Sequence, residues 1–361
     1  MNSKRFFILA YARQNLGDDL FIYMLLKKYP ETKFYINIEK PEHAKLFESF
    51  ENITIYQDVG RKLTKENANE YDGYIYIGGS IFMEGIGANY TVTEQLLSFM
   101  QECKKQEIPF HYVSSNFGPY NTEGYLNLTK EVMKNCASVH FRDKYSSDLF
   151  SEVPTVYYAP DLAFSYIPEK IEIKPNSIGI SVIDLSIRPK LIEYKDNYYN
   201  ILIENIKDYI GNGKNVTLFS FCKHEGDERA IEELVKRLPV DIKEKVNILN
   251  YDGDIEYFLR EYSKMEYVIC SRFHAMILSA IMNQKCQILS YSNKFDNVIN
   301  DLELFTNKIL HFNEICLDTK MPLEGFQKVD RIKIQFIRVE AVKQLSGVDE
   351  SLNGIKEVVT V

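Results

Sequence analysis

The chain has 361 residues, of which 45% are apolar and 26% are charged. This length and this apolar share predict two domains with buried cores, because a single small domain would be shorter. The net charge of −8 at pH 7 argues against a nucleic-acid groove, since tracking a phosphate backbone needs a surplus of Lys and Arg. No apolar stretch is long enough to span a bilayer, so we expect a soluble protein without a transmembrane segment.

The apolar run from Phe6 to Ala12 follows Lys4 and Arg5 and so resembles a short signal peptide. Arg13 ends the run at the lower limit of the usual length, and a first β-strand explains the same residues, so we prefer the strand. The six cysteines are scattered through the sequence without a C-x-x-C pair. They therefore read as small core residues in a reducing compartment, and we expect a cytoplasmic protein with no disulfide framework and no zinc site.

Short apolar runs alternate with amphipathic segments through the first half of the chain, and this alternation predicts a mostly parallel sheet. One such amphipathic segment is 93–103. The expected strands are 6–11, 34–38, 53–56, 74–77, 110–113, 139–141 and 156–158.

The first expected strand leads into a loop that can contact a ligand. Asn15, Gly17 and Asp18 lie where this strand turns into an expected helix, 19–28. Glycine there permits a close approach of backbone to ligand, while Asn or Asp can cap the helix. These residues either act only as a cap or also shape the floor of a ligand site.

A glycine-rich turn follows the expected strand 74–77. Gly78, Gly79 and Ser80 can present consecutive N–H groups to a phosphate or a sugar hydroxyl, although a purely structural turn explains them equally well. The pattern is neither G-x-G-x-x-G nor a P-loop, so it predicts no dinucleotide and no ATP.

Two further strands of the first half end in charged residues. Arg142 follows 139–141 and can hold a carboxylate or phosphate with two parallel hydrogen bonds, while Asp143 can cap the next helix. A surface ion pair is the alternative for Arg142. Asp161 follows 156–158, where it could accept a proton from a sugar hydroxyl or simply hold a turn.

The composition changes at residues 166–176, which we interpret as a linker between domains. Beyond it the strand and helix alternation repeats, with helices whose apolar positions follow the helical period at 231, 234, 235, 238 and at 255, 258, 259, 262. The second set of expected strands is 178–183, 216–221, 246–249, 267–270 and 287–289. His224 follows the second of these strands, but one His with nearby carboxylates is too few ligands for a zinc site.

The stretch from Met265 to Asp296 is the most informative in the sequence. A buried strand, 267–270, is followed by Arg272 and His274 and then by an apolar helix, 275–282. Ligands of open α/β sheets bind at the carboxyl ends of strands. A helix amino terminus, a guanidinium and an imidazole together predict a site for a small anion that must also receive or lose a proton.

These observations predict an α/β fold of two doubly wound Rossmann-like domains that face each other across a cleft. The expected ranges are 1–165 for the first domain, 166–176 for the linker, 177–325 for the second domain with the Arg-x-His motif, and 326–361 for a helical tail that packs near the first domain.

The order of these motifs resembles the polysaccharide pyruvyl transferase family. The matching residues are Asn15-Leu16-Gly17-Asp18, Gly78-Gly79-Ser80, Arg142-Asp143, Pro160-Asp161, the acidic residues after His224, Arg272 with His274, and Tyr291 with Lys294. At Ser80 family members often have a third glycine. The resemblance implies a GT-B-like architecture and transfer of a pyruvyl group from phosphoenolpyruvate to two hydroxyls of a sugar, which forms a cyclic ketal and releases phosphate.

The implied reaction assigns roles to the candidate residues. Arg272, Arg142 and Lys294 would bind the donor, and His274 would act as general acid. The remaining candidates, which would shape the site or contact the acceptor, are Asn15, Gly17, Asp18, Gly78, Gly79, Ser80, Asp161 and His224. The general base stays open among Asp18, Glu84 and Asp161. The scheme requires no metal and no organic cofactor.

The acceptor would be a sugar of a glycan or glycan precursor. A lipid-linked precursor would bring the protein to the periphery of the membrane, and the sequence does not specify the oligomeric state. Two other functions fit the same fold: a nucleotide-sugar-dependent glycosyltransferase, which would need a pocket for a nucleobase, and a non-catalytic carbohydrate-binding protein. Binding of a nucleoside diphosphate would distinguish the first alternative, and absence of turnover the second.

Overall fold

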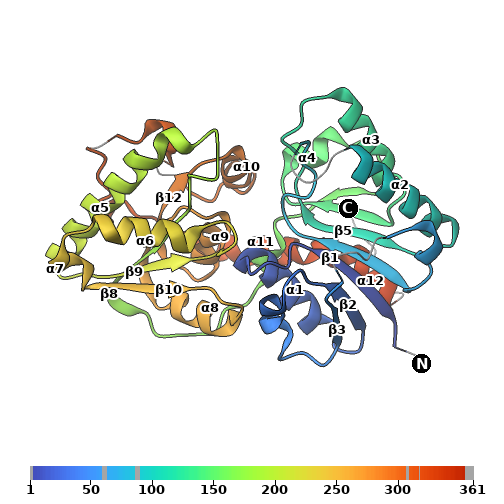
Figure 1. Cartoon of the computed structure of the whole chain (residues 1–361), viewed down its shortest axis with the longest axis horizontal. Helices are drawn as coiled ribbons and strands as arrows, with labels where there is room; N and C mark the ends of the chain where they lie inside the picture. The colour runs from blue at the N-terminus through green and yellow to red at the C-terminus, as the bar shows by residue number, and fades with distance from the viewer. Residues whose placement is uncertain (1–2, 59–62, 86–89, 306–308, 317, 354–361) are drawn as a thin grey trace. The chain divides into compact units, whose positions relative to one another are not determined.

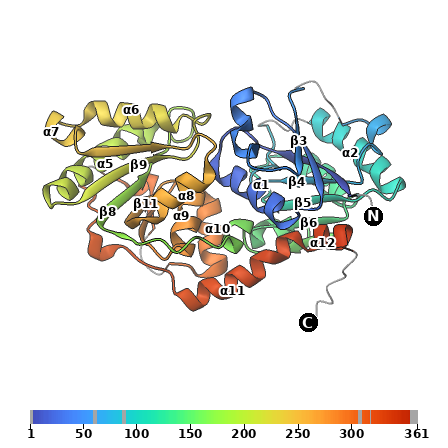
Figure 2. The same ribbon diagram turned by 90° about the horizontal axis from the view of Figure 1, so that it is seen from below.

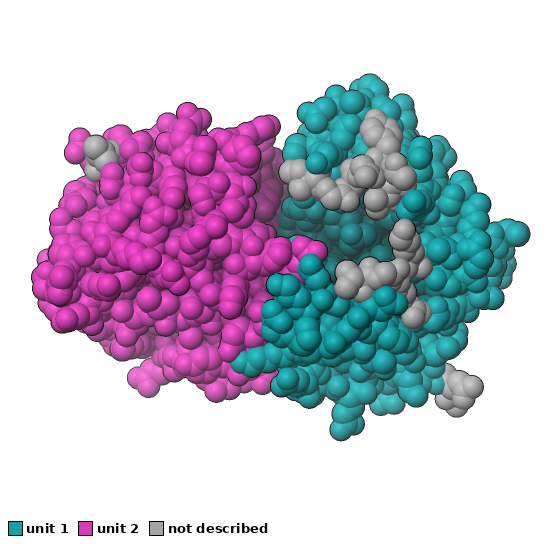
Figure 3. All heavy atoms as spheres, in the orientation of Figure 1, with its two compact units in different colours: residues 1–12, 18–165, 337–361 teal, residues 13–17, 166–336 magenta. Residues whose placement is uncertain are grey.

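The computed structural model describes residues 3–58, 63–85, 90–305, 309–316 and 318–353. The chain divides into two compact units (Figure 3). Unit 1 contains residues 1–12, 18–165 and 337–361, and unit 2 contains residues 13–17 and 166–336. Residues 13–17, which the sequence analysis places in the first domain, group with unit 2 because their backbone pairs there. The Leu16 N–H donates to the Phe221 carbonyl at 3.0 Å, and Asn15 forms an antiparallel bridge with Cys222.

Unit 1 contains a seven-stranded sheet with the order β3-β2-β1-β4-β5-β6-β7, in which all neighbours are parallel (Figure 1). The order reverses between β1 and β4, so the carboxyl ends of these strands form a topological switch point. The strands are β1 (Arg5–Ala10), β2 (Lys33–Asn37), β3 (Ile53–Tyr56), β4 (Gly73–Ile77), β5 (Phe110–Ser115), β6 (Ser138–Phe141) and β7 (Val156–Tyr158).

Helices connect these strands and cover the sheet. Two of them begin at side-chain caps: Thr122 accepts a hydrogen bond from the Tyr125 N–H, and Asp143 accepts one from the Ser146 N–H, as expected for an Asp at that position. The helices of unit 1 that precede the linker are α1 (Leu16–Lys28), α2 (Tyr90–Lys105), α3 (Glu123–Met133) and α4 (Lys144–Leu149), with short 3-10 helices at Pro41–Phe47, Lys65–Asn67 and Leu162–Ser165.

Unit 2 contains a six-stranded parallel sheet with the order β10-β9-β8-β11-β12-β13. Its switch point lies between β8 and β11. The strands are β8 (Lys174–Ser181), β9 (Asn215–Ser220), β10 (Val246–Asn250), β11 (Met265–Cys270), β12 (Lys285–Ser290) and β13 (Leu310–His311). Two parallel sheets with connecting helices confirm the predicted α/β class of two Rossmann-like domains.

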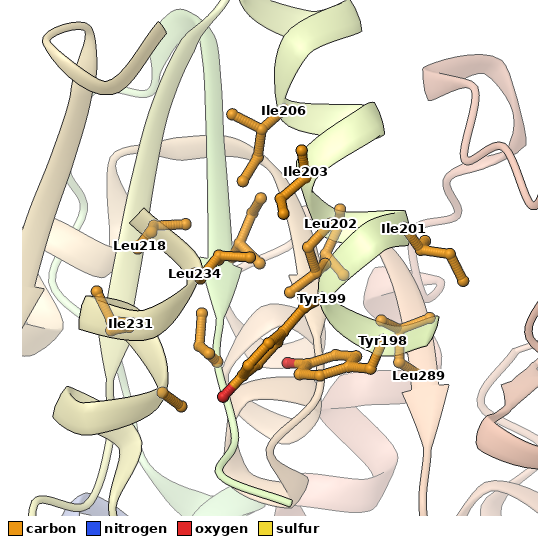
Figure 4. Packing of buried hydrophobic residues seen from close by; sticks show 14 of the residues in the cluster. Tyr198, Tyr199, Ile201, Leu202, Ile203, Ile206, Leu218, Ile231, Leu234 and Leu289 are labelled. Carbon is orange, nitrogen blue, oxygen red and sulfur yellow. The ribbon is translucent and has the colours of Figure 1, made fainter. Parts of the chain in front are cut away.

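The helices after the linker are α5 (Lys195–Gly211), α6 (Asp227–Arg237), α7 (Val240–Lys243), α8 (Ile255–Ser263), α9 (Phe273–Ile281), α10 (Asn293–Leu302), α11 (Arg331–Ala341) and α12 (Ser346–Asn353). Short 3-10 helices occur at Ile192–Tyr194, Phe312–Glu314, Leu323–Gly325 and Val342–Leu345. Figure 4 shows the core of unit 2, where Tyr199 and Leu202 of α5 pack with Leu218 of β9 and Leu234 of α6. All eight positions of the predicted helical period in α6 and α8, including Leu238 just after α6, are buried.

The segment after residue 336 packs on unit 1 (Figure 2). Gln344 is fully buried, and its side chain joins the ends of three strands. Its Oε1 accepts from the Ser114 N–H at 2.8 Å, and its Nε2 donates to the carbonyls of Phe141, Ala159 and Pro160 at 3.2, 2.6 and 3.2 Å. In the described part of the chain, no helix is both long and apolar enough to cross a membrane.

Candidate functional site

Arg272 lies at the switch point of the unit 2 sheet. It lies two residues after the end of β11 and occupies the position before the first residue of α9. The backbone N–H groups of Ser271 and Arg272 donate to Ser181 Oγ at 2.8 and 3.2 Å, and Ser181 ends the neighbouring strand β8. The turn from β11 to α9 is therefore fastened to the strand across the switch point.

Two carboxylates hold the guanidinium of Arg272. Its Nε donates to Asp227 Oδ2 at 3.0 Å, its Nη2 donates to Asp227 Oδ1, and its Nη1 donates to Glu225 Oε2 at 2.5 Å. Burial alone would lower the pKa of Arg272, but Asp227 and Glu225 outweigh it and raise that pKa well above its ordinary value. The side chain is therefore a fixed positive charge, 7% exposed.

A second arginine shares Glu225. Arg188 Nη2 donates to Glu225 Oε2 at 2.6 Å. Burial would raise the pKa of Glu225, but Arg272 and Arg188 together lower it to about 2. The sequence analysis missed Arg188. The signal that could have found it is its place in the loop after β8, at the carboxyl end of a switch-point strand.

Lys294 completes a cationic cluster, which we define as Arg188, Arg272 and Lys294. Tyr291 lies near two of these cations. The Arg188 guanidinium and the Lys294 ammonium each lie 5.4 Å from the centroid of the Tyr291 ring. Burial would raise the pKa of Tyr291, but Lys294, Arg272 and Arg188 outweigh it and lower that pKa. Three cations face two carboxylates, Glu225 and Asp227, so the cluster carries excess positive charge suited to an anion.

His274 lies in the first turn of α9, and its ring packs against Gly17. A Cβ built on Gly17 would lie 1.8 Å from His274 Nδ1. Asn15 Oδ1 accepts from the Gly17 N–H at 3.2 Å, so Asn15 holds the turn that carries the glycine. His224, which is exposed, lies near the same segment, with its Nε2 3.2 Å from Arg13 Nη1.

The candidates of the first half meet at the carboxyl ends of the unit 1 sheet. Arg142 is 3% exposed, and its guanidinium donates to Asp161 Oδ2 at 2.9 Å and to Asn116 Oδ1 at 2.7 Å. Asp161 is fully buried, so this pair is an internal ion pair and not one on the surface. The sequence analysis did not single out Asn116, which follows β5.

The glycine-rich turn after β4 adjoins this ion pair. A Cβ on Gly79 would lie 2.5 Å from Arg142 Nη2, so the guanidinium packs on the bare backbone of the turn. Gly78 has φ = +144°, which side-chain-bearing residues rarely adopt, and a Cβ there would lie 3.4 Å from Asp18 Oδ1. Ser80 Oγ donates to Asn116 Oδ1 at 3.4 Å. Glu84 instead holds the loop before α3, accepting from the N–H groups of Asn121 and Thr122.

The structure thus sorts the predicted residues into two groups. Unit 2 contains Asn15, Gly17, His224, Arg272, His274 and Lys294, and unit 1 contains Asp18, Gly78, Gly79, Ser80, Arg142 and Asp161. Within the described ranges, no group of three or more His, Cys, Asp and Glu side chains could hold a metal ion.

Comparison with known proteins adds a family and a fold. A family model described as polysaccharide pyruvyl transferase matches residues 15–293. No curated protein matches the sequence. A Listeria monocytogenes structure assigned as a UDP-N-acetylglucosamine 2-epimerase has a TM-score of 0.60 at 12% identity, covering 99% of this chain and 98% of the other.

Two more solved structures are similar over most of their length. Staphylococcus aureus MnaA with UDP has a TM-score of 0.57 at 10% identity, with 98% of each chain covered. Anabaena HepE with UDP and glucose has a TM-score of 0.54 at 11% identity, covering 98% of this chain and 100% of the other. These similarities confirm the predicted GT-B type of fold.

Proposed function

The chain belongs to the polysaccharide pyruvyl transferase family, and from this premise we propose that it transfers a pyruvyl group from phosphoenolpyruvate to two hydroxyls of one sugar residue. The observation that carries the proposal is the cationic cluster of Arg188, Arg272 and Lys294 at the switch point of the unit 2 sheet, with His274 two residues after Arg272 in the first turn of α9. Phosphoenolpyruvate has a carboxylate and a phosphate close together, and several fixed cations match that pair of anions.

Arg272 can bind the donor although carboxylates already hold it. A guanidinium has five N–H donors, and three of those of Arg272 are directed at Asp227 and Glu225. The other two are available for a donor oxygen. The carboxylates fix the orientation of the fork, so that binding costs little side-chain entropy.

The proposed reaction has two bond-forming steps at C2 of the donor. One sugar hydroxyl oxygen bonds to C2 while His274 adds a proton to C3, which becomes the methyl carbon. The second hydroxyl oxygen then bonds to C2 and displaces the phosphate. One hydroxyl proton replaces the proton that His274 gave, and the other leaves with phosphate. General acid catalysis of this kind contributes about 10²- to 10⁴-fold in rate.

The unit 1 group has a different part in the proposal. Arg142 pairs with Asp161 and Asn116, and we assign it to binding of the donor or the acceptor. Asp18, whose Oδ1 would lie 3.4 Å from a Cβ at Gly78, is the base candidate that adjoins the glycine-rich turn. The acceptor is a sugar of a glycan or glycan precursor, in a lipid-linked or free form.

The test is a pair of ligand titrations with the full chain. Phosphoenolpyruvate should raise the melting temperature in a concentration-dependent way, because a ligand that binds only the folded state stabilises it by mass action. With a suitable acceptor from a panel of lipid-linked and nucleotide-linked sugars, phosphate should be released. Equal concentrations of UDP should shift the melting temperature little.

The opposite result would reject the proposal. A large shift of the melting temperature with UDP and none with phosphoenolpyruvate would indicate a nucleotide-sugar enzyme. UDP is bound in the Staphylococcus aureus and Anabaena structures. Inorganic sulfate serves as the control for unspecific anion binding, and should stabilise less than phosphoenolpyruvate at the same ionic strength.

A further inference from the structure

Gly17 and His274 are in direct contact within unit 2, although they lie 257 positions apart in the sequence and belong to different motifs. A Cβ at Gly17 would lie 1.8 Å from Nδ1 and 2.4 Å from both Cγ and Cε1 of His274. Real Cβ atoms essentially never come within 3.0 Å of such atoms. The imidazole therefore occupies the space that any side chain at residue 17 would need.

Backbone conformation does not explain the glycine. Gly17 is buried in the first turn of α1, and it is not among the glycines with positive φ. Alanine is the better helix former by about 1 kcal/mol in a helix interior. The contact with the His274 ring is the feature that excludes alanine here.

The segment that carries Gly17 is tied to the support of Arg272. The Leu16 N–H donates to the Phe221 carbonyl at 3.0 Å, and Asn15 bridges Cys222. The N–H groups of Phe221 and Cys222 in turn donate to Asp227 Oδ2 at 3.1 and 3.0 Å, and Asp227 holds the Arg272 guanidinium. One short stretch after β9 thus fixes both the wall behind His274 and the carboxylate behind Arg272.

We propose that Gly17 is a positioning residue, whose bare backbone sets the place of the His274 imidazole relative to Arg272. This inference rests on the proposed function for the role of His274 in turnover, but the contact itself does not depend on which reaction is catalysed. It also explains why a motif from the beginning of the sequence groups with unit 2.

The first experiment is a double-mutant cycle on stability, with the variants Gly17→Ala, His274→Ala and both together. Gly17→Ala should lower the melting temperature in the wild-type background, because the new methyl group collides with the ring. In the His274→Ala background the same change should lower it much less. Gly211→Ala is the matched control, since a Cβ at Gly211 meets no atom within 4 Å. If Gly17→Ala lowered the melting temperature equally in the wild-type and His274→Ala backgrounds, the contact between residue 17 and the ring would be rejected.

The second experiment reads the imidazole directly. The ring resonances of His274, assigned by comparison with His274→Gln, should move in Gly17→Ala, while those of the exposed His224 should move less. Phosphate release should fall about tenfold to a hundredfold in kcat, with a smaller change in the KM for phosphoenolpyruvate, because a displacement of about 1 Å can cost that much. Asn15→Ala, which removes the acceptor of the Gly17 N–H without adding volume, should give a milder form of both effects and serves if Gly17→Ala does not fold.

These readouts separate the two proposals. Unchanged His274 resonances in both Gly17→Ala and Asn15→Ala would reject Gly17 as a positioning residue. Shifted resonances in a protein whose wild type releases no phosphate from phosphoenolpyruvate would retain the positioning residue and reject only the proposed function.

Discussion

Arg272 shows how one residue can be both part of the protein scaffold and part of a ligand site. Its guanidinium holds Asp227, which is fully buried, and Glu225, which it shares with Arg188. The planar fork is required for this, because it reaches two carboxylates and still leaves donors for a third anion. Arg272 therefore combines the anion binding expected of it with ion pairs to two carboxylates, which the sequence analysis did not predict.

Arg272→Lys should lower both activity and stability. An ammonium cannot reproduce the two hydrogen bonds to Asp227, and a buried carboxylate that loses hydrogen-bond partners costs about 1–3 kcal/mol or more. We expect a lower free energy of unfolding in urea and a loss of phosphate release of at least about a hundredfold. Arg260→Lys is the control, because Arg260 is about half exposed and lies 4.0 Å from its nearest carboxylate. Wild-type stability and kinetics in Arg272→Lys would remove this residue from both roles.

At the scale of elements, the 3-10 helix Val342–Leu345 completes the carboxyl ends of β5, β6 and β7. Those three strands lead into Asn116, Arg142 and Asp161. Gln344 forms hydrogen bonds with one N–H and three carbonyl groups there. Because its side chain is fully buried, solvent water does not reach these groups in the folded protein. The unit 1 group is therefore supported by a segment that is distant in sequence.

Gln344→Ala should destabilise unit 1 by about 3 kcal/mol or more, because it leaves several buried backbone groups without partners. Gln335→Ala, at an exposed position of α11, should change stability by less than about 0.5 kcal/mol. Chemical unfolding followed by circular dichroism measures both. If the two variants were equally stable, Gln344 would not be a structural link.

The elements themselves were largely predictable. Apolar runs of three to six residues indicated every strand except β13, which has only two residues and no pattern to detect. Long-range pairing was not predictable, because nothing in the local sequence of residues 13–17 indicates a partner near residue 222. The same holds for Arg188 and Gln344, whose partners lie 37 and more than 180 positions away.

At the scale of the whole molecule, each unit is built from separated segments, and in unit 1 two histidines help to join them. His111 contacts Ser138 through Nδ1 and Ser351 through Nε2, both at 2.9 Å, and His140 Nε2 lies 3.0 Å from Ser346 Oγ. Burial lowers the pKa of His111 to about 3, with His140 adding to the effect, and burial lowers the pKa of His140 to about 4. The C-terminal segment is thus attached through imidazoles that must stay neutral.

Acid should therefore weaken the protein at a mild pH. Both histidines have a pKa of about 6.5 when unfolded, so the unfolded chain binds more protons as the pH falls below that value. The stability they contribute is complete above about pH 6.5 and is lost as the pH falls toward their folded values. The loss should reach about 2 kcal/mol per histidine by pH 5. Urea unfolding at a series of pH values measures it, and His140→Asn should reduce the slope by about half. A flat profile between pH 7 and pH 5 would contradict this account.

The position of Gln344 also has a consequence for synthesis on the ribosome. Its partner Pro160 is made 184 residues earlier, which at 5–20 residues per second is an interval of roughly 10 to 40 s. During that interval the N–H of Ser114 and the carbonyl groups of Phe141, Ala159 and Pro160 are still without the side chain that binds them in the folded protein. Translation therefore delivers the sheet before the side chain that closes it, and the contacts of Gln344 form only after that residue has left the ribosome.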